Sequence, residues 1–136
     1  MTILRARELR VQIGAAPVVD GVDLDVAAGE AFGIVGESGS GKSMTALAVL
    51  GLLPATARLS ARELRIAGQD ALALSPSARR ALGGRVVSMI FQDPMTALNP
   101  VRRVGSLLVE AIRRHRPVPR EAAQRDRKST RLNSSH

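Results

Sequence analysis

Eight consecutive residues have the types and spacing of a phosphate-binding loop. They are Gly36-Glu37-Ser38-Gly39-Ser40-Gly41-Lys42-Ser43, which match the pattern G-x-x-x-x-G-K-[ST]. The glycines allow backbone conformations that other residues avoid, so successive N–H groups can turn inward as a nest for a β-phosphate. Lys42 is predicted to reach the β- and γ-phosphates as a catalytic charge, and Ser43 to offer its hydroxyl to Mg²⁺. The loop therefore predicts a bound nucleoside triphosphate.

The segments on either side of the loop fit the setting that this motif requires. The apolar run from Ala31 to Val35 is predicted as a buried strand, and residues 44–53 as a helix that Pro54 stops. Its predicted apolar face contains Leu47 and Leu50, with Ala46 and Leu53 at its edge. The helix dipole would point at the same anions, so Met44 joins Gly36 to Ser43 in the predicted nucleotide-binding set.

Lysine usage supports this interpretation against a flexible Gly/Ser-rich turn that fits the pattern by chance. Residues 1–125 contain sixteen arginines and one lysine, Lys42. Because nearly every other basic residue is arginine, we expect position 42 to need the compact ammonium group of lysine and not a planar guanidinium group.

The remaining pattern predicts an α/β fold with an antiparallel β subdomain and a phosphate-loop NTPase core. Alternating apolar residues before the loop indicate half-buried antiparallel strands, and Ala28-Gly29-Glu30 a turn. The alternating residues are Leu9, Val11, Ile13, Val18, Val22, Leu24 and Val26. A short strand is predicted at residues 64–66, followed by a turn at residues 67–70.

Later segments predict two helices and a second apolar strand. Ser75 and Pro76 suit the N-cap and first position of a short helix to about Leu82, which Gly83-Gly84 ends. Val86, Val87, Met89 and Ile90 would form the strand. An amphipathic helix is expected from Val104 to about Arg116, with Leu107, Leu108, Ala111 and Ile112 facing inward.

Composition weighs against several classes of protein. The net charge is +8, which by itself would suit nucleic acid or an anionic membrane, but there is no Tyr or Trp to stack on bases. There is no cysteine for a disulfide or a thiolate metal site. No apolar run approaches the roughly 18–20 residues of a membrane span.

Residues 126–136, Asp-Arg-Lys-Ser-Thr-Arg-Leu-Asn-Ser-Ser-His, resemble the in-frame translation of a short-read sequencing adapter. We therefore expect them to be a non-native tail, to be left out of fold reasoning. Residues 1–125 would then be the N-terminal part of one truncated domain, with a net charge of +6. A polar natural tail is the alternative.

Two stretches together resemble the ATP-binding subunit of ABC transporters, and within that family the oligopeptide, dipeptide and nickel importers. They are GESGSGKSMTALAVLGLLP from Gly36 to Pro54 and MIFQDPMTALNP from Met89 to Pro100. The resemblance covers nearly all of residues 3–116. It implies ATP and Mg²⁺ as ligands, and ATPase activity coupled to import. It also implies permease subunits, a second ATPase subunit and, indirectly, a solute-binding protein as partners at the cytoplasmic face of the bacterial inner membrane, with no nucleic acid.

The resemblance also assigns a role to Gln92. This residue matches the family's Q-loop glutamine, which implies a catalytic and Mg²⁺-contacting role, and a side-chain amide can orient water without adding charge. A helical subdomain would begin at about residue 93. Residues 93–100 would start the surface that meets the permease, although Asp93 equally fits a simple turn before Pro94.

The sequence departs from the family pattern in two ways. Where family members stack adenine on an aromatic ring, residues 13–16 are Ile-Gly-Ala-Ala. The signature motif, the Walker B carboxylates and the switch histidine do not occur in residues 1–136. This stretch alone is therefore expected to be inactive and to leave apolar strand edges exposed. A soluble phosphate-loop ATPase acting on nucleic acid remains the alternative function.

Overall fold

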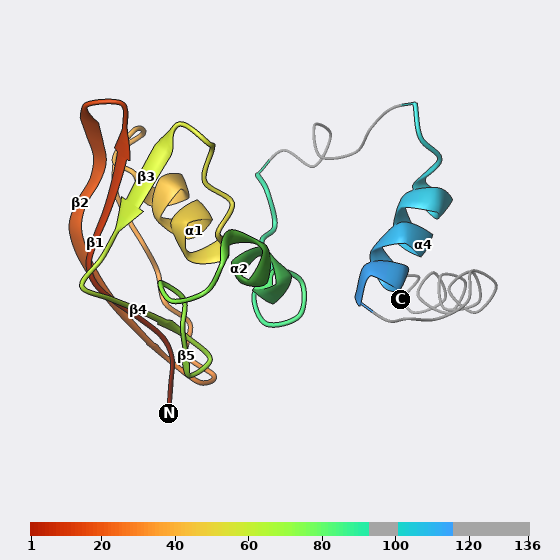
Figure 1. Cartoon of the computed structure of the whole chain (residues 1–136), viewed down its shortest axis with the longest axis horizontal. Helices are drawn as coiled ribbons and strands as arrows, with labels where there is room; N and C mark the ends of the chain where they lie inside the picture. Colours follow the sequence, from red (N-terminus) through yellow and green to blue (C-terminus); the bar gives the residue numbers. More distant parts are fainter. Residues whose placement is uncertain (93–100, 116–136) are drawn as a thin grey trace. The chain divides into compact units, whose positions relative to one another are not determined.

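The computed structural model describes residues 1–92 and 101–115, which fall into two compact units, Met1–Ser88 and Met89–His136. The first unit is a sheet that curves around a helix (Figure 1). The mixed α/β fold confirms the predicted fold class. The suspected tail at residues 126–136 and the segment at residues 93–100 lie outside the described residues.

The sheet is built on a long antiparallel hairpin, as the alternating pattern predicts. Strand β1 (Thr2–Ile13) pairs with β2 (Ala16–Ala27) through a turn at Gly14 and Ala15. The register shifts between Ala6 and Leu9, where Glu8 has a φ of 50°, and such a bulge bends the hairpin.

Three short strands complete the sheet on the other side of β1. They are β3 (Ala57–Ser60), β4 (Glu63–Ile66) and β5 (Gln69–Asp70). The order is β2-β1-β4-β5, while β3 pairs with the far end of β1. The predicted strand at residues 64–66 is thus confirmed, and the turn expected at residues 67–70 is confined to Ala67 and Gly68.

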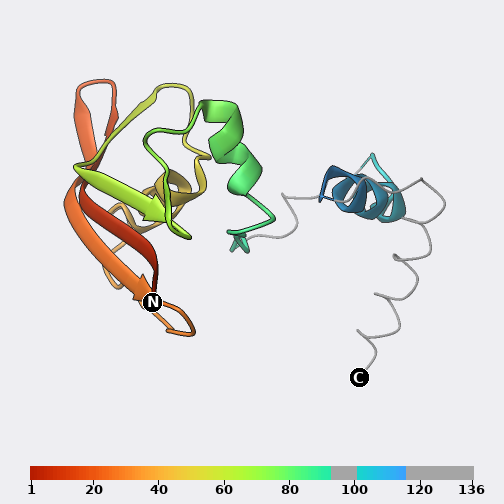
Figure 2. The same ribbon diagram turned by 60° about the horizontal axis from the view of Figure 1, so that its bottom comes forward.

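Helix α1 (Lys42–Leu50) lies against one face of the sheet, as Figures 1 and 2 both show. The helix is shorter than predicted, because Gly51 takes a left-handed conformation with a φ of 71° and ends it before Pro54. The predicted apolar face is also wrong for Leu47 and Ala46, which are only half-buried. The side chains that α1 buries are Thr45, Ala48, Val49 and Leu50.

The core of this unit lies between α1 and the sheet. Its sheet side consists of Ala6, Leu9, Val11, Val19, Leu24, Leu64 and Ile66, to which α1 adds Ala48 and Val49, and Ala71 follows β5. Leu9 and Leu64 are fully buried. This apolar layer fixes α1, and with it the end of the phosphate-binding loop, against β1 and β2.

The buried strand predicted at residues 31–35 is not formed. These residues lie in no strand, and Phe32, Ile34 and Val35 are 46%, 45% and 97% exposed. A parallel strand of this kind requires neighbours on both sides. No segment among the described residues pairs with this one.

Helix α2 (Pro76–Leu82) confirms its predicted cap, since the Ser75 hydroxyl accepts a hydrogen bond from the Ala78 N–H at 3.2 Å. The strand predicted at Val86, Val87, Met89 and Ile90 is wrong. Only an isolated bridge joins Gly83 to Val87, and Ile90 is 96% exposed. As at residues 31–35, the described residues provide no neighbouring strand.

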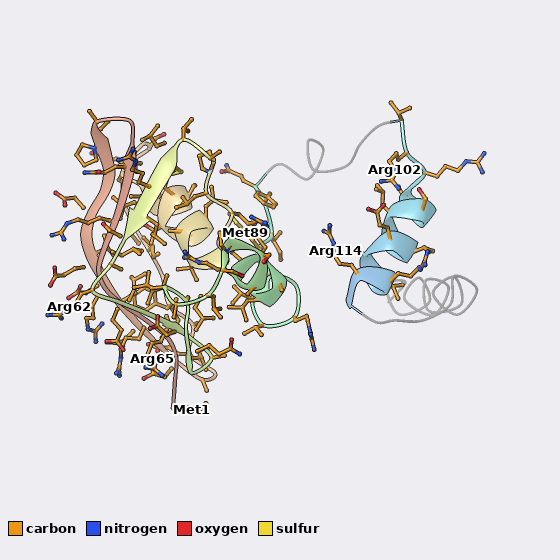
Figure 3. All side chains as sticks on the ribbon, in the orientation of Figure 1. Met1, Arg62, Arg65, Met89, Arg102 and Arg114 are labelled. Atoms are coloured by element: carbon orange, nitrogen blue, oxygen red, sulfur yellow. The ribbon has the colours of Figure 1, made fainter. Side chains whose placement is uncertain are left out.

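In the second unit, α4 (Val104–His115) confirms the predicted helix. Its buried residue is Val109, however, whereas Leu108 is 39% exposed and Ala111 is exposed too, so the predicted inward face is only partly right. Arg102, which is labelled in Figure 3, forms an ion pair with Glu110 at 2.7 Å. Among the described residues, none of the helices combines the length and apolarity needed to cross a membrane.

We predict that Leu9→Ala destabilises the chain by about 2–5 kcal/mol, because it removes fully buried methyl groups and leaves a cavity. The free energy of unfolding in urea, followed by circular dichroism, measures this. Leu72→Ala is the matched control, since Leu72 is 39% exposed, and it should cost about 1 kcal/mol or less. Equal losses in the two variants would contradict the assignment of the core.

The sheet also predicts a dependence of stability on acid pH. Two hydrogen bonds lower the pKa of the Asp25 carboxyl, the larger effect coming from Arg7 and the smaller from Arg5. A lowered folded-state pKa means that the stabilisation is present above the unfolded-state pKa of about 4 and is lost as pH falls further. Asp25→Asn should therefore flatten the fall in Tm below about pH 4, and an unchanged slope in that variant would contradict it.

Candidate nucleotide-binding site

The predicted phosphate-binding loop connects residues 31–35 to α1 and closes at the start of that helix. Gly41 is the N-cap of α1, with a φ of 88° and no side chain to cap the helix. Within the described part of the chain, the N–H groups of Gly41, Lys42, Ser43 and Met44 donate no hydrogen bond. Free N–H groups and the positive end of the helix dipole together make an anion-binding cradle at this position.

Lys42 closes the loop on itself. Its Nζ donates hydrogen bonds of 2.6 Å to the carbonyl oxygens of Gly36 and Glu37, and one of 3.2 Å to Oγ of Ser40. An additional backbone bond joins the Ser40 N–H to the Glu37 carbonyl at 3.1 Å. The ammonium is thereby held beside the cradle, with its charge uncompensated by any carboxylate among the described residues.

A side chain on either of two loop glycines would meet a neighbouring atom. A Cβ at Gly36 would lie 2.5 Å from Oγ of Ser40, and a Cβ at Gly41 would lie 2.6 Å from the Val18 carbonyl oxygen of β2. Gly39 differs, because its φ is 82° but its surroundings are open. The loop thus requires glycine at Gly41 for space and at Gly39 and Gly41 for backbone conformation, while a side chain at Gly36 would displace the Ser40 hydroxyl.

The Ser43 side chain is exposed, and its hydroxyl has no hydrogen-bond partner within the residues described. A hydroxyl at the start of the helix, next to the phosphate cradle, suits a ligand to Mg²⁺. Thr45 behaves differently: it is buried, and its hydroxyl donates back to the Gly41 carbonyl at 2.9 Å. Of the two hydroxyls in the first turn, Ser43 is therefore the one free to bind a ligand.

Gln92 is exposed and belongs to the unit that begins at Met89. The phosphate-binding loop belongs to the other unit, so the predicted pairing of Gln92 with Ser43 at Mg²⁺ stays a prediction. The neighbouring stretch from Asp93 to Pro100 lies outside the described residues.

One contact near the site was not predicted from the sequence. Arg79 of α2 donates a hydrogen bond of 2.5 Å to the Ala48 carbonyl at the C-terminal end of α1. Its Cγ lies 3.0 Å from where a Cβ on Gly51 would be, and burial lowers the pKa of its guanidinium. A cation suits the negative end of the helix dipole. No signal in the sequence could have linked residues so far apart.

A glycine-rich loop at the N-terminus of a helix packed on a sheet defines the class of phosphate-loop nucleotide-binding proteins. Residues 19–135 match the family model described as ABC transporter, and the chain belongs to that family.

Several similar proteins are named as transport ATP-binding proteins. The dipeptide transport ATP-binding proteins DppD of Haemophilus influenzae and Escherichia coli are 46% and 47% identical to this chain over 119 residues. These matches cover 85% of the chain and 36% of each relative. The oligopeptide transport ATP-binding protein OppD of Escherichia coli is 41% identical over 125 residues, which is 89% of the chain and 37% of that protein. The chain thus spans little more than a third of these relatives.

We predict that Gly41→Ala lowers both stability and nucleotide affinity more than Gly39→Ala. Both substitutions strain a left-handed backbone, at about 1 kcal/mol each, but only the first places a methyl group against the Val18 carbonyl. Urea unfolding and titration with a fluorescent ATP analogue would measure the two effects. If Gly39→Ala were the more harmful change, the proposed contact between the loop and β2 would be wrong.

Proposed function

We propose that this chain is part of the ATP-binding subunit of an importer for dipeptides, oligopeptides or similar solutes. The observation that carries the proposal is the 41–47% identity to dipeptide and oligopeptide transport ATP-binding proteins. That identity extends over the phosphate-binding loop whose geometry is described above. In the intact protein, ATP binding and hydrolysis would drive solute movement through a membrane permease.

The loop residues support the first step, which is to hold ATP. Gly36 to Met44 would surround the phosphates, with the free backbone N–H groups of Gly41 to Met44 as donors, and Lys42 would add a fixed positive charge beside them. Ser43 would hold Mg²⁺, which when bound neutralises charge on the β- and γ-phosphates. Residues 13–16 lack an aromatic ring, so base contacts contribute little, and phosphate contacts would supply most of the affinity.

Gln92 would act in the second step, which is hydrolysis. Its amide can orient the attacking water and contact the metal while adding no charge. Lys42 and Gln92 are thus the proposed catalytic residues of this chain. The catalytic carboxylate and the signature motif would come from residues outside this sequence and from a second ATPase subunit.

The proposed setting is the cytoplasmic face of the bacterial inner membrane. Permease subunits and a second ATPase subunit would be the direct partners, and a solute-binding protein would act through the permease. The alternative, an ATPase acting on nucleic acid, has less support. Arg7, Arg10, Arg62 and Arg102 each form an ion pair with a carboxylate, so these arginines do not form an open cationic surface.

Binding of a fluorescent ATP analogue to the full chain tests the nucleotide site. Lys42→Ala should weaken binding at least about tenfold, because a charge-assisted contact to phosphate is lost. Ser43→Ala should abolish the extra affinity that Mg²⁺ provides. Ser38→Ala is the matched control, since only its backbone is assigned to the phosphates, and it should bind normally. Equal binding by all three variants and the wild type would refute the site.

Transport can be tested with a chimera in which residues 1–116 of this chain replace the matching part of an Escherichia coli dipeptide transport ATP-binding protein. The reconstituted importer should support ATP-dependent dipeptide uptake into vesicles, and Gln92→Ala in the chimera should abolish uptake while leaving ATP binding intact. A chimera that assembles and binds ATP but gives no uptake would contradict the transport assignment.

A further inference from the structure

A row of four charged side chains crosses four neighbouring strands of the sheet. Arg5 on β1 lies opposite Asp25 on β2 on one side and opposite Arg65 on β4 on the other, and Arg65 lies opposite Asp70 on β5. The residues that flank Arg65 along β4 are buried. Because side chains alternate along a strand, the row lies on the face that α1 does not cover. Two cations therefore face each other in the middle of the row.

Only one of these two cations forms an ion pair with a carboxylate among the residues described. Arg5 donates from Nε to Oδ1 of Asp25 at 3.0 Å, but Asp25 also pairs with Arg7. Arg65 donates from Nη2 to the Gly68 carbonyl at 2.9 Å and has no carboxylate partner among the residues described. Oδ1 of Asp70 accepts instead from the Leu72 N–H at 3.0 Å. Like charges that face each other across a strand pair are unfavourable unless an anion offsets them.

The same two arginines line a hollow of about 250 Å³, together with Thr2 and Gly68. The turn beneath it is fixed, because Ala67 and Gly68 have φ values of 48° and 79° and the Ala67 N–H donates to the Ile3 carbonyl at 2.8 Å. Arg65, which Figure 3 labels, is an exposed residue of β4. One hollow is thus lined by three residues whose side chains carry hydrogen-bond donors, Thr2, Arg5 and Arg65.

We propose that this hollow, the Arg5–Arg65 site, binds an oxyanion of phosphate size. Guanidinium groups recognise phosphate oxygens through pairs of parallel hydrogen bonds, and two of them across a strand pair can grip one group from both sides. Thr2 also lines the hollow and carries a hydroxyl that could act as a third donor. The site lies on the sheet face away from α1, so it is separate from the nucleotide loop and does not depend on the proposed function. The phosphate is either a free anion or the headgroup of a phospholipid.

Calorimetric titration with inorganic phosphate tests the site. The full chain carries Lys42→Ala throughout, so that the nucleotide loop contributes little to the signal. In this background Arg65→Gln should weaken phosphate binding about tenfold. Arg58→Gln removes the same charge from the exposed face of neighbouring β3 and should change the affinity less than about twofold. Equal weakening by both substitutions would mean a general charge effect and would overturn the proposal.

A second variant strengthens the test because it predicts a gain. Asp70→Asn removes the negative charge opposite Arg65 but keeps the oxygen that accepts from Leu72, so the turn should persist. Phosphate should then bind about threefold more tightly. Weaker or unchanged binding in this variant would count against the site, and its unfolding curve checks that the fold is intact.

Sedimentation with vesicles identifies the source of the phosphate. One set is phosphatidylcholine alone, and the other contains phosphatidylglycerol. Loss of vesicle binding in Arg65→Gln but not in Arg58→Gln would assign a lipid headgroup. Titratable phosphate binding without vesicle binding would assign a free anion. Absence of both kinds of binding in the parent chain would overturn the proposal.

Discussion

The close approach of Gly41 to the Val18 carbonyl constrains the rest of the first unit. At the start of α1, the Gly41 backbone packs so close to the Val18 carbonyl of β2 that a Cβ would not fit between them. Ala48 and Val49 anchor the same helix in the core. The helix cannot tilt or slide without breaking one of these contacts. The loop therefore takes its shape from the sheet, although none of its residues belongs to a strand.

The lysine adds a second constraint within the loop. By donating to the carbonyl groups of Gly36 and Glu37, Lys42 turns a flexible stretch into a closed ring and directs carbonyl oxygens toward its own charge. The N–H groups at the start of α1 remain without acceptors in the described structure. The carbonyl acceptors of Gly36 and Glu37 are thus occupied by Lys42, while the donors at the start of α1 stay available to an anion.

The features that could be predicted from the sequence are those with a local cause. The alternation along β1 and β2 and the Ser75-Pro76 start of α2 each follow from a few adjacent residues, as does the composition of the loop. Residues 31–35 and 86–90 failed as strands because a strand also needs a neighbour, and apolar composition says nothing about where that neighbour is. The buried face of α1 was predicted correctly at Leu50 but missed Ala48 and Val49, because the helix is apolar on most sides and only the position of the sheet selects these two residues.

The candidate site likewise contains residues that the sequence could predict and contacts that it could not. Glycine spacing, Lys42 and Ser43 were recognisable, since the chemistry of phosphate binding restricts residue type at each position. The contacts of Val18 and Arg79 were not, because each depends on a long-range approach that leaves no local pattern. The role proposed for Gln92 rests on family resemblance. The spacing of residues along the chain does not predict where Gln92 lies relative to the loop.

The length of α1 is fixed at both ends. Left-handed glycines border it, and each is pressed by a neighbour: Gly41 by the Val18 carbonyl, and Gly51 by the Arg79 side chain. One inserted residue would advance the helix by about 1.5 Å and turn its end by roughly 100°. Either the loop or the Arg79 contact would then be lost. We conclude that this helix tolerates changes of residue type on its exposed side far better than any insertion or deletion.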